Sequence, residues 1–168
     1  SEIGGGFGGK TTVFLEPTAL LLSRKSGRPV KMTMTREEVF RASGPTASTS
    51  IDIKIGMKNN GKITAATGDY RYQNGAYEAM NGTLGAMTGF APYDLEHVRT
   101  IGWDVVTNRP KAAAYRAPGA PMAAFAVESV IDELAHQLGL DPIDVRLMNA
   151  AREGTRAAYG PTYPAIGL

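Results

Sequence analysis

Hydrophobic and polar residues alternate over residues 51–57, and a second alternating run begins at Lys62. The segment Asn59-Asn60-Gly61 separates the two runs. Because Asn and Gly tolerate the positive φ of a tight turn, this arrangement predicts a β-hairpin whose return strand extends to about Tyr72. Residues 96–107 are rich in Val, Ile and Trp and predict a further strand.

Apolar residues at helical spacing predict two helices in the last third of the chain. The first carries Val127 and Ile131 on its core face, and Glu128 and Asp132 are expected to face away. A second helix is expected directly afterwards, because the Asp-Pro pair at positions 141–142 suits an N-cap followed by a first helical turn.

The first part of the chain predicts a helix, a strand and a second helix. Residues 12–26 favour a helix, with an alternative start at Pro17 because proline is tolerated in a first helical turn. Residues 28–34 alternate as a strand does. Thr35 and Glu38 have the spacing of a capping box, which predicts a short helix.

Residues 77–92 show no clean period and are expected to form a short helix or a loop. With the other elements this predicts an α+β fold, in which a mixed or antiparallel sheet carries helices on one side. Residues 1–168 are expected to be part of a larger domain. Ser1-Glu2-Ile3 is too short for the strand that normally leads into the glycine turn that follows.

Composition and charge argue against several functions. The net charge of +2 comes without a basic stripe interleaved with aromatic residues, which argues against nucleic-acid binding. There is no cysteine, and His97 and His136 are isolated from other ligand types, so we expect neither an iron–sulfur nor a zinc site. Without a leader or an apolar run of about eighteen residues, we expect no membrane span and a cytoplasmic location.

The segment Gly4-Gly5-Gly6-Phe7-Gly8-Gly9-Lys10-Thr11, the first turn, fits two phosphate-binding patterns, GxxxxGK[ST] and GxGxxG. In a phosphate-loop nucleotide triphosphatase its amides would hold phosphate, Lys10 would reach across it and Thr11 would meet magnesium. An equally good interpretation is a tight turn between closely packed elements. Lys10 would then cap a carbonyl.

Two features argue against a phosphate-loop nucleotide triphosphatase. This function nevertheless remains the alternative prediction. The aspartate that should hold magnesium at a strand end is missing, since Asp104 lies within a predicted strand. The local hairpin of residues 47–72 also differs from the alternating parallel strands and helices of phosphate-loop folds.

The segment Ala114-Tyr115-Arg116-Ala117-Pro118-Gly119-Ala120-Pro121, the second turn, precedes the longest predicted helix. It places an arginine and a run of backbone amides near a helix N-terminus. That arrangement favours an anion or an electronegative cofactor.

Together the two turns resemble the large, molybdopterin-binding subunit of the molybdenum hydroxylases, the family of xanthine dehydrogenase, aldehyde oxidase and the aerobic carbon monoxide dehydrogenases. The resemblance covers nearly the whole chain. Further matching stretches follow in the family's order: Thr33-Met34-Thr35-Arg36-Glu37-Glu38, Thr107-Asn108-Arg109-Pro110, Asp132-Glu133-Leu134-Ala135, Asp141-Pro142 and Arg146.

The resemblance implies that amides of the first turn approach the metal end of a molybdopterin cofactor, in its simple or its cytosine dinucleotide form. The second turn would contact the pterin or the active-site pocket. No residue is expected to bind the metal directly, and the family's catalytic glutamate belongs to a motif outside these residues. The implied cofactor-binding residues are Gly5, Gly6, Phe7, Gly8, Gly9, Tyr115, Arg116 and Ala117.

The implied reaction is oxidation of an aldehyde or an N-heterocycle with water as the oxygen source. Thr11 stands where xanthine dehydrogenases carry a glutamate and Pro118 where they carry an aromatic residue, which weakens a purine substrate. Ala117 replaces the cysteine of the carbon monoxide enzymes, which argues against copper chemistry.

The resemblance also implies partners. Iron–sulfur and FAD units in other domains or subunits would carry the electrons away, and the 168 residues are expected to be inactive alone. A binding or assembly module that keeps the fold but has lost the cofactor is a third interpretation.

Overall fold

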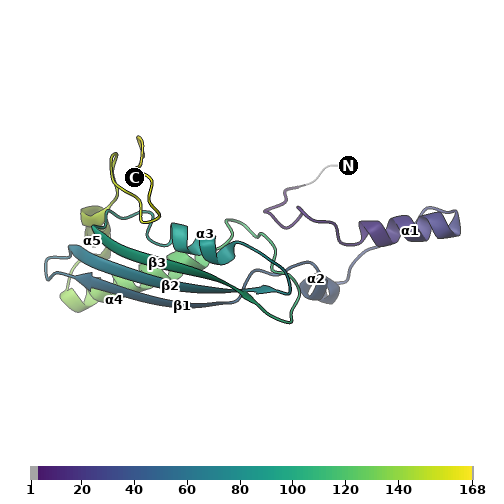
Figure 1. Ribbon diagram of the computed structural model, residues 1–168, viewed down its shortest axis with the longest axis horizontal. Helices are drawn as coiled ribbons and strands as arrows, with labels where there is room; N and C mark the ends of the chain where they lie inside the picture. Colours follow the sequence, from purple (N-terminus) through teal and green to yellow (C-terminus); the bar gives the residue numbers. More distant parts are fainter. Residues whose placement is uncertain (1–3, 168) are drawn as a thin grey trace.

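A computed structural model describes residues 4–167, and Ser1-Glu2-Ile3, on which the expectation of a larger parent domain partly rested, lies outside them. None of the helices in the described part has the length and apolar character that a bilayer crossing requires. In chain order the elements are α1 (Glu16–Ser26), α2 (Arg36–Ala42), β1 (Thr49–Met57), β2 (Ile63–Gly75), α3 (Asn81–Thr88), β3 (His97–Val106), α4 (Ala120–Leu138) and α5 (Pro142–Asn149) (Figure 1).

The sheet is mixed and has the strand order β1-β2-β3. The predicted hairpin is present: β1 and β2 pair antiparallel, from Thr49 opposite Tyr72 to Met57 opposite Ile63. β3 pairs with the other edge of β2 in parallel, after the short helix α3. The predicted α+β class with a mixed sheet is therefore confirmed.

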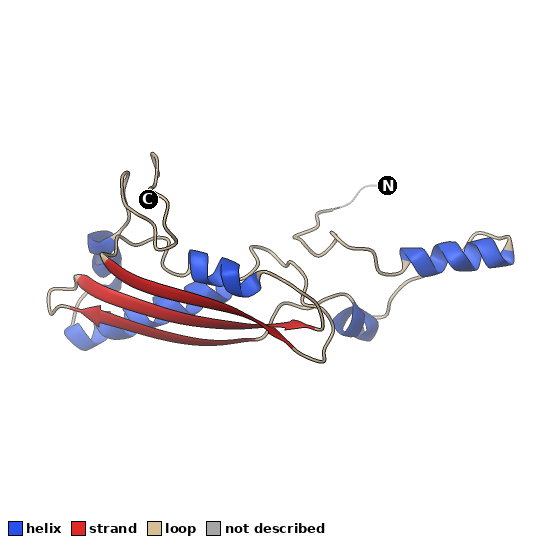
Figure 2. Cartoon of the chain, viewed as in Figure 1, coloured by secondary structure: helices blue, strands red, loops and turns tan. Residues whose placement is uncertain are grey.

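Helices cover one face of this sheet, as predicted (Figure 2). Along β2, Tyr70 and Tyr72 are buried, whereas Thr67 and Arg71 on the alternate positions are exposed. α3 packs against β2 and β3, and α4 packs against β1. The open face carries charge, with Arg71 2.8 Å from Asp52.

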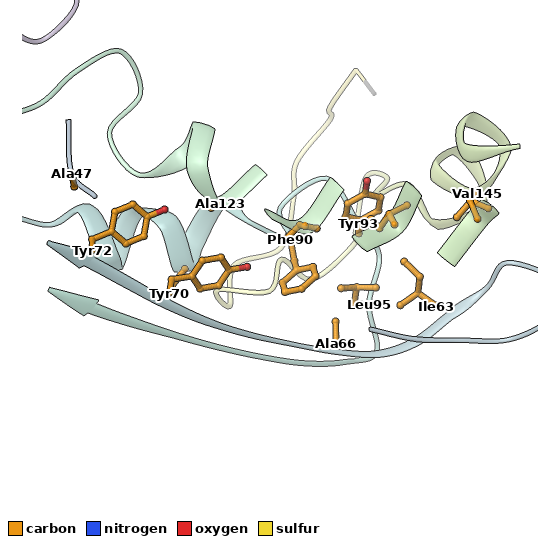
Figure 3. Close-up of a cluster of buried hydrophobic side chains, with 14 of the residues drawn as sticks. Ala47, Ile63, Ala66, Tyr70, Tyr72, Phe90, Tyr93, Leu95, Ala123 and Val145 are labelled. Carbon is orange, nitrogen blue, oxygen red and sulfur yellow. The ribbon is translucent and has the colours of Figure 1, made fainter. Parts of the chain in front are cut away.

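The core is a row of large side chains between the sheet and the helices (Figure 3). Tyr70, Tyr72 and Phe90 are almost fully buried, and α4 contributes Val127 and Ile131. Burying each such side chain stabilises the fold by roughly 1.5–3 kcal/mol. The apolar face predicted for this helix is thus the face that packs in the core.

Arg146 joins α5 to α4. Its Nε donates to Glu128 and its Nη1 to Asp132, each at 2.7 Å. The Tyr93 hydroxyl donates to the same Glu128 carboxylate, and burial together with this carboxylate raises the pKa of Tyr93. Glu128 and Asp132 were expected to face away from the packed side of the helix. Instead they face α5, because Arg146 pairs with both.

The N-terminal part departs from the prediction. α1 begins at Glu16 rather than at residue 12, and Pro17 lies in its first turn. The alternative start at Pro17 was therefore closer to the observed start of the helix. Residues 28–34, predicted to be a strand, form none. Within the described residues no strand lies beside them to complete a ladder, and alternation alone does not make a strand.

The capping box predicted for α2 is present. The Glu38 amide donates to Thr35 Oγ1 at 3.3 Å, and the Thr35 amide donates to Glu38 Oε2 at 2.7 Å. The hydrogen bonds donated by the Thr35 amide and hydroxyl lower the pKa of Glu38, because they favour its charged form.

Asn149 ties the end of α5 to the turn between β1 and β2. Its side chain is fully buried. Its Oδ1 accepts from the Ile63 amide at 2.9 Å, and its Nδ2 donates to the carbonyls of Gly61 and Val145, each at 2.8 Å. One side chain thus completes the hydrogen bonding of two separate elements.

The substitution Asn149→Ala is expected to lower the free energy of unfolding by about 3 kcal/mol, because it leaves the buried Ile63 amide and Gly61 carbonyl without partners. Urea denaturation followed by circular dichroism measures the change. Asn59→Ala in the same turn is the control, since Asn59 is exposed, and its effect should stay within about 0.5 kcal/mol. Equal losses in the two variants would contradict the anchoring role.

Candidate cofactor-binding site

The two glycine-containing turns lie against each other, although they are far apart in sequence. The Arg116 amide donates to the Phe7 carbonyl at 2.7 Å. Gly8 has a φ of 85°, and a Cβ placed on it would lie 2.6 Å from the Ala114 carbonyl oxygen. Such contacts are shorter than real Cβ atoms make, so the turns can approach this closely only because residue 8 is glycine.

Backbone strain is concentrated in the same two turns. Among the described residues, the non-glycine residues with positive φ are Phe7 (49°), Arg116 (34°) and Ala117 (57°). This conformation costs an L-residue roughly 1–2 kcal/mol. Residues held in it cluster at ligand sites, where the surrounding structure imposes them. All three belong to the set that the sequence predicted to bind a cofactor.

In the first turn, several carbonyl oxygens are hydrogen-bonded within the described part of the chain, whereas two backbone amides are not. Within residues 4–167, the amides of Phe7 and Gly8 donate no hydrogen bond. A turn with this polarity suits an electronegative ligand. Four consecutive carbonyl oxygens of the turn accept from within the chain: Gly5 from Lys10 Nζ, Gly6 from the Gly9 amide at 2.9 Å, Phe7 from the Arg116 amide at 2.7 Å, and Gly8 from Thr11 Oγ1 at 3.0 Å.

This arrangement argues against the phosphate-loop interpretation. Lys10 and Thr11 both bind carbonyls of their own turn, so Lys10 acts as the cap that was one of its two predicted roles. The turn does not lead directly into a helix, since α1 begins only at Glu16. Asp104 accepts from the Asn74 side chain at 2.6 Å and holds the protein together rather than a metal.

Tyr72 fixes the base of the second turn. Its hydroxyl donates to the Gly119 carbonyl at 2.6 Å, and burial raises the pKa of Tyr72 to about 12, so the phenol remains a donor. Gly119 has a φ of 80°, and a Cβ there would lie 2.5 Å from the Asn81 carbonyl at the start of α3. The sequence identified Tyr72 only as a strand residue, because a positioning contact of this kind has no local pattern.

A cavity of about 590 Å³ lies beside the turns. Its lining includes residues 11–14, which start at the end of the first turn, and residues 110–114, which end at the start of the second. Residues 77–81, Leu84, residues 42–44 and Pro118 form the rest. The cavity therefore combines segments from both turns with the helix that the second turn packs against.

The hydrogen bond between Arg116 and Phe7 brings the two groups of predicted cofactor-binding residues together, but none of Gly5–Gly9 or Tyr115–Ala117 lines this cavity. Tyr115 is exposed. The half-buried members of the set are Gly5, Gly8 and Gly9, and the exposed members are Gly6, Phe7, Tyr115, Arg116 and Ala117.

A larger hollow of about 860 Å³ lies at the other end of the sheet, around the β1–β2 turn, with Lys58, Lys62, His97 and Arg156 in its lining. None of the predicted site residues borders it. The described residues contain no group of three His, Cys, Asp or Glu side chains placed to hold a metal ion.

The site thus consists of two strained turns in contact, one of which carries two backbone amides without partners among the described residues. The family model of the molybdopterin cofactor-binding domain matches residues 1–150, and the chain belongs to this family. The family predicted from the two turns is thereby confirmed.

Two relatives extend the match. The chain is 37% identical over 156 residues to the xanthine dehydrogenase molybdenum-binding subunit of Escherichia coli O157:H7, covering 90% of this chain and 21% of that protein. It is 33% identical over 160 residues to the nicotinate dehydrogenase large molybdopterin subunit of Eubacterium barkeri, covering 94% and 38%. The chain thus spans about a fifth of the first relative's length.

Solved structures agree with this assignment. Aldehyde oxidoreductase from Desulfovibrio gigas superposes with a TM-score of 0.84 at 30% identity, covering 95% of this chain and 18% of that one. Quinoline 2-oxidoreductase from Pseudomonas putida 86 gives a TM-score of 0.85 at 27% identity, covering 97% and 22%. Two enzymes of different name therefore share the fold of this chain.

Replacing the tyrosine that holds the second turn tests its positioning role. Tyr72→Phe is expected to lower the free energy of unfolding by about 1–2 kcal/mol, because the Gly119 carbonyl loses its donor. Tyr70→Phe is the matched control on the same strand. The Tyr70 hydroxyl is buried without a hydrogen-bond partner among the described residues, so its removal should leave stability unchanged or raise it by up to about 1 kcal/mol. Urea denaturation that shows equal destabilisation of both variants would refute the assignment.

Proposed function

We propose that this chain forms part of the cofactor site of a molybdenum hydroxylase, an enzyme that oxidises an aldehyde or an N-heterocycle with water as the oxygen source. One observation carries the proposal: within the described residues the Phe7 and Gly8 amides donate no hydrogen bond, whereas the four carbonyls from Gly5 to Gly8 all accept one within the protein. Membership of the molybdopterin cofactor-binding family supports it.

The residues present fit a molybdopterin cofactor in their chemistry. Its metal ligands and phosphate are electronegative, and free backbone amides are the donors that such groups accept from. Glycines at positions 5, 6, 8 and 9 leave room for close approach, and Arg116 adds an exposed positive charge on the second turn. When bound, the cofactor supplies the two-electron oxidation itself.

This chain's own contribution is binding and orientation. The Phe7 and Gly8 amides, within the segment Gly5–Gly9, would hold the metal end of the cofactor, and Tyr115, Arg116 and Ala117 would hold it from the second turn. We assign no catalytic base to these residues, since the family's glutamate is expected elsewhere in the parent chain. The 168 residues are accordingly proposed to be inactive alone.

The substrate and the partners follow from the same proposal. Among the similar proteins are an aldehyde oxidoreductase, a nicotinate dehydrogenase and a quinoline 2-oxidoreductase, which supports both an aldehyde and an N-heterocycle. Relatives named as subunits support assembly with further units. We propose that these include iron–sulfur and FAD units that take the electrons, and that the protein is cytoplasmic.

The substitution Gly8→Ala in the complete parent subunit is expected to lower its molybdenum and pterin content at least tenfold. The new Cβ would lie 2.6 Å from the Ala114 carbonyl and force the two turns apart. A tenfold change in binding corresponds to about 1.4 kcal/mol. The backbone strain at residue 8 and the loss of the contact with Ala114 are together expected to cost more than this. Elemental analysis of molybdenum and fluorescence of the released pterin measure the content.

Gly4→Ala is the control, because a Cβ on Gly4 has nothing within 4 Å and its φ is not positive. This variant should keep full cofactor content. Retention of the cofactor by Gly8→Ala would contradict the proposed contact. Absence of molybdenum and pterin from the unmodified parent protein would instead favour an assembly module that has lost the cofactor.

A further inference from the structure

We propose that Asn60, in the turn between β1 and β2, is a site of spontaneous deamidation, and that the fold protects the other two Asn-Gly pairs of the chain. The three pairs are Asn60-Gly61, Asn74-Gly75 and Asn81-Gly82. The turn that carries Asn60 lies at the end of the sheet away from the two cofactor turns (Figure 1). The modification is therefore independent of the function proposed above.

The reaction at an Asn-Gly pair needs only the chain and water. Asparagine is chemically labile, and a following glycine has no Cβ to crowd the attacking nitrogen. The Gly61 backbone nitrogen loses its proton and bonds to Cγ of Asn60. The Cγ–Nδ2 bond breaks, and Nδ2 leaves as ammonia with one added proton. Water then opens the resulting five-membered succinimide at either of its two carbonyls. One opening gives aspartate, and the other gives isoaspartate, whose main chain is longer by one methylene.

Asn60 has the features that this reaction requires. The residue is exposed, so water can reach the succinimide from its side. Its Oδ1 accepts from the Lys62 amide at 3.2 Å. A donor at this oxygen stabilises the negative charge that develops on it during the attack on Cγ. Lys58 and Lys62 flank the turn, and their positive charges favour the deprotonated amide and the carboxylate product.

One interaction opposes the attack. Gly61 is buried, and its amide donates to the Lys58 carbonyl at 2.9 Å, a hydrogen bond that must break before the nitrogen reacts. The net contribution of one such hydrogen bond is small, so its loss slows the reaction by about tenfold at most. The turn therefore delays the conversion of Asn60 without preventing it.

The structure holds the other two pairs in one buried network. Asn74 and Asn81 are only 1% and 6% exposed. The Asn74 Nδ2 donates to Asp104 at 2.6 Å, and its Oδ1 accepts from Asn81 Nδ2 at 3.0 Å. The Gly82 amide, which is the nitrogen that would attack Asn81, donates to the same Asp104 at 2.9 Å. Reaction at either asparagine breaks several buried hydrogen bonds at once, which slows it at least about a hundredfold relative to Asn60.

Conversion of Asn60 acts on the contact between the turn and α5. The buried Asn149 side chain binds the Gly61 carbonyl at 2.8 Å and the Ile63 amide at 2.9 Å. Isoaspartate lengthens the main chain directly before Gly61 and shifts Gly61 relative to Ile63. Asn149 can then no longer satisfy both groups, and the turn is released from the helix.

The test follows all three pairs in the same protein. The complete parent subunit is kept at a mildly alkaline pH, sampled over several weeks, digested and analysed by mass spectrometry. Electron-transfer fragmentation separates isoaspartate from aspartate. In the folded protein we expect Asn60 to convert at least about a hundredfold faster than Asn74 and Asn81. In guanidinium the three rates should become similar, because every pair has the same following glycine and the fold no longer holds any of them.

Two variants separate the altered backbone from its added charge. Asn60→Gln removes the site, since attack on its longer side chain needs a six-membered ring. Asn60→Asp carries the charge of the product on a main chain of normal length. Hydrogen exchange of the Ile63 amide should be about tenfold faster in aged than in fresh parent protein, because its bond to Asn149 is lost. Exchange in fresh Asn60→Asp and in aged Asn60→Gln should match that of the fresh parent protein.

Each result decides one part of the proposal. An unmodified Asn60 after ageing, or conversion of Asn74 or Asn81 at the same rate in the folded protein, would overturn the assignment of the site. Isoaspartate at position 60 with unchanged exchange at Ile63 would overturn the effect on the Asn149 contact. Equally fast exchange in fresh Asn60→Asp would show that charge, and not the longer main chain, releases the turn.

Discussion

The close approach of two backbones, at Gly8 and Ala114, is the constraint on which the site depends. A single hydrogen bond of 2.7 Å, from the Arg116 amide to the Phe7 carbonyl, fixes the register of the two turns at this contact. With it, the four carbonyls from Gly5 to Gly8 all accept hydrogen bonds within the protein, whereas the Phe7 and Gly8 amides donate none among the described residues. Separation of the turns would remove this hydrogen bond and the close approach of Gly8 to Ala114.

A strained site of this kind needs a scaffold that holds it in place. The core supplies it on the sheet side, where Tyr72 reaches from β2 to the base of the second turn. At the far end of the sheet, Asn149 closes the hairpin turn, and Arg146 with its carboxylate partners fixes α5 against α4. The stable hydrogen-bonded elements therefore lie away from the cofactor turns. The backbone conformations that cost free energy lie within the turns themselves.

The residues of the turns have the chemistry of binding rather than of catalysis. The two turns offer backbone amide donors and the exposed Arg116, which are means of binding and orienting. The groups that perform the reaction, the cofactor and a proton-accepting glutamate, are expected from elsewhere in the enzyme. This division agrees with the coverage of the relatives, of which the chain spans about a fifth in the xanthine dehydrogenase subunit.

Local sequence determined much of this protein. The hairpin around Gly61, the capping box of α2 and the helices α4 and α5 were predicted, because turn chemistry, caps and periodicity act over a few residues. The motif letters of the two turns also identified the family. Tertiary structure decided the rest. It left residues 28–34 without a strand partner, turned Glu128 toward Arg146 and set β3 parallel to β2. It also imposed positive φ on Phe7 and joined the turns, since contacts between distant segments leave no periodic pattern in the sequence.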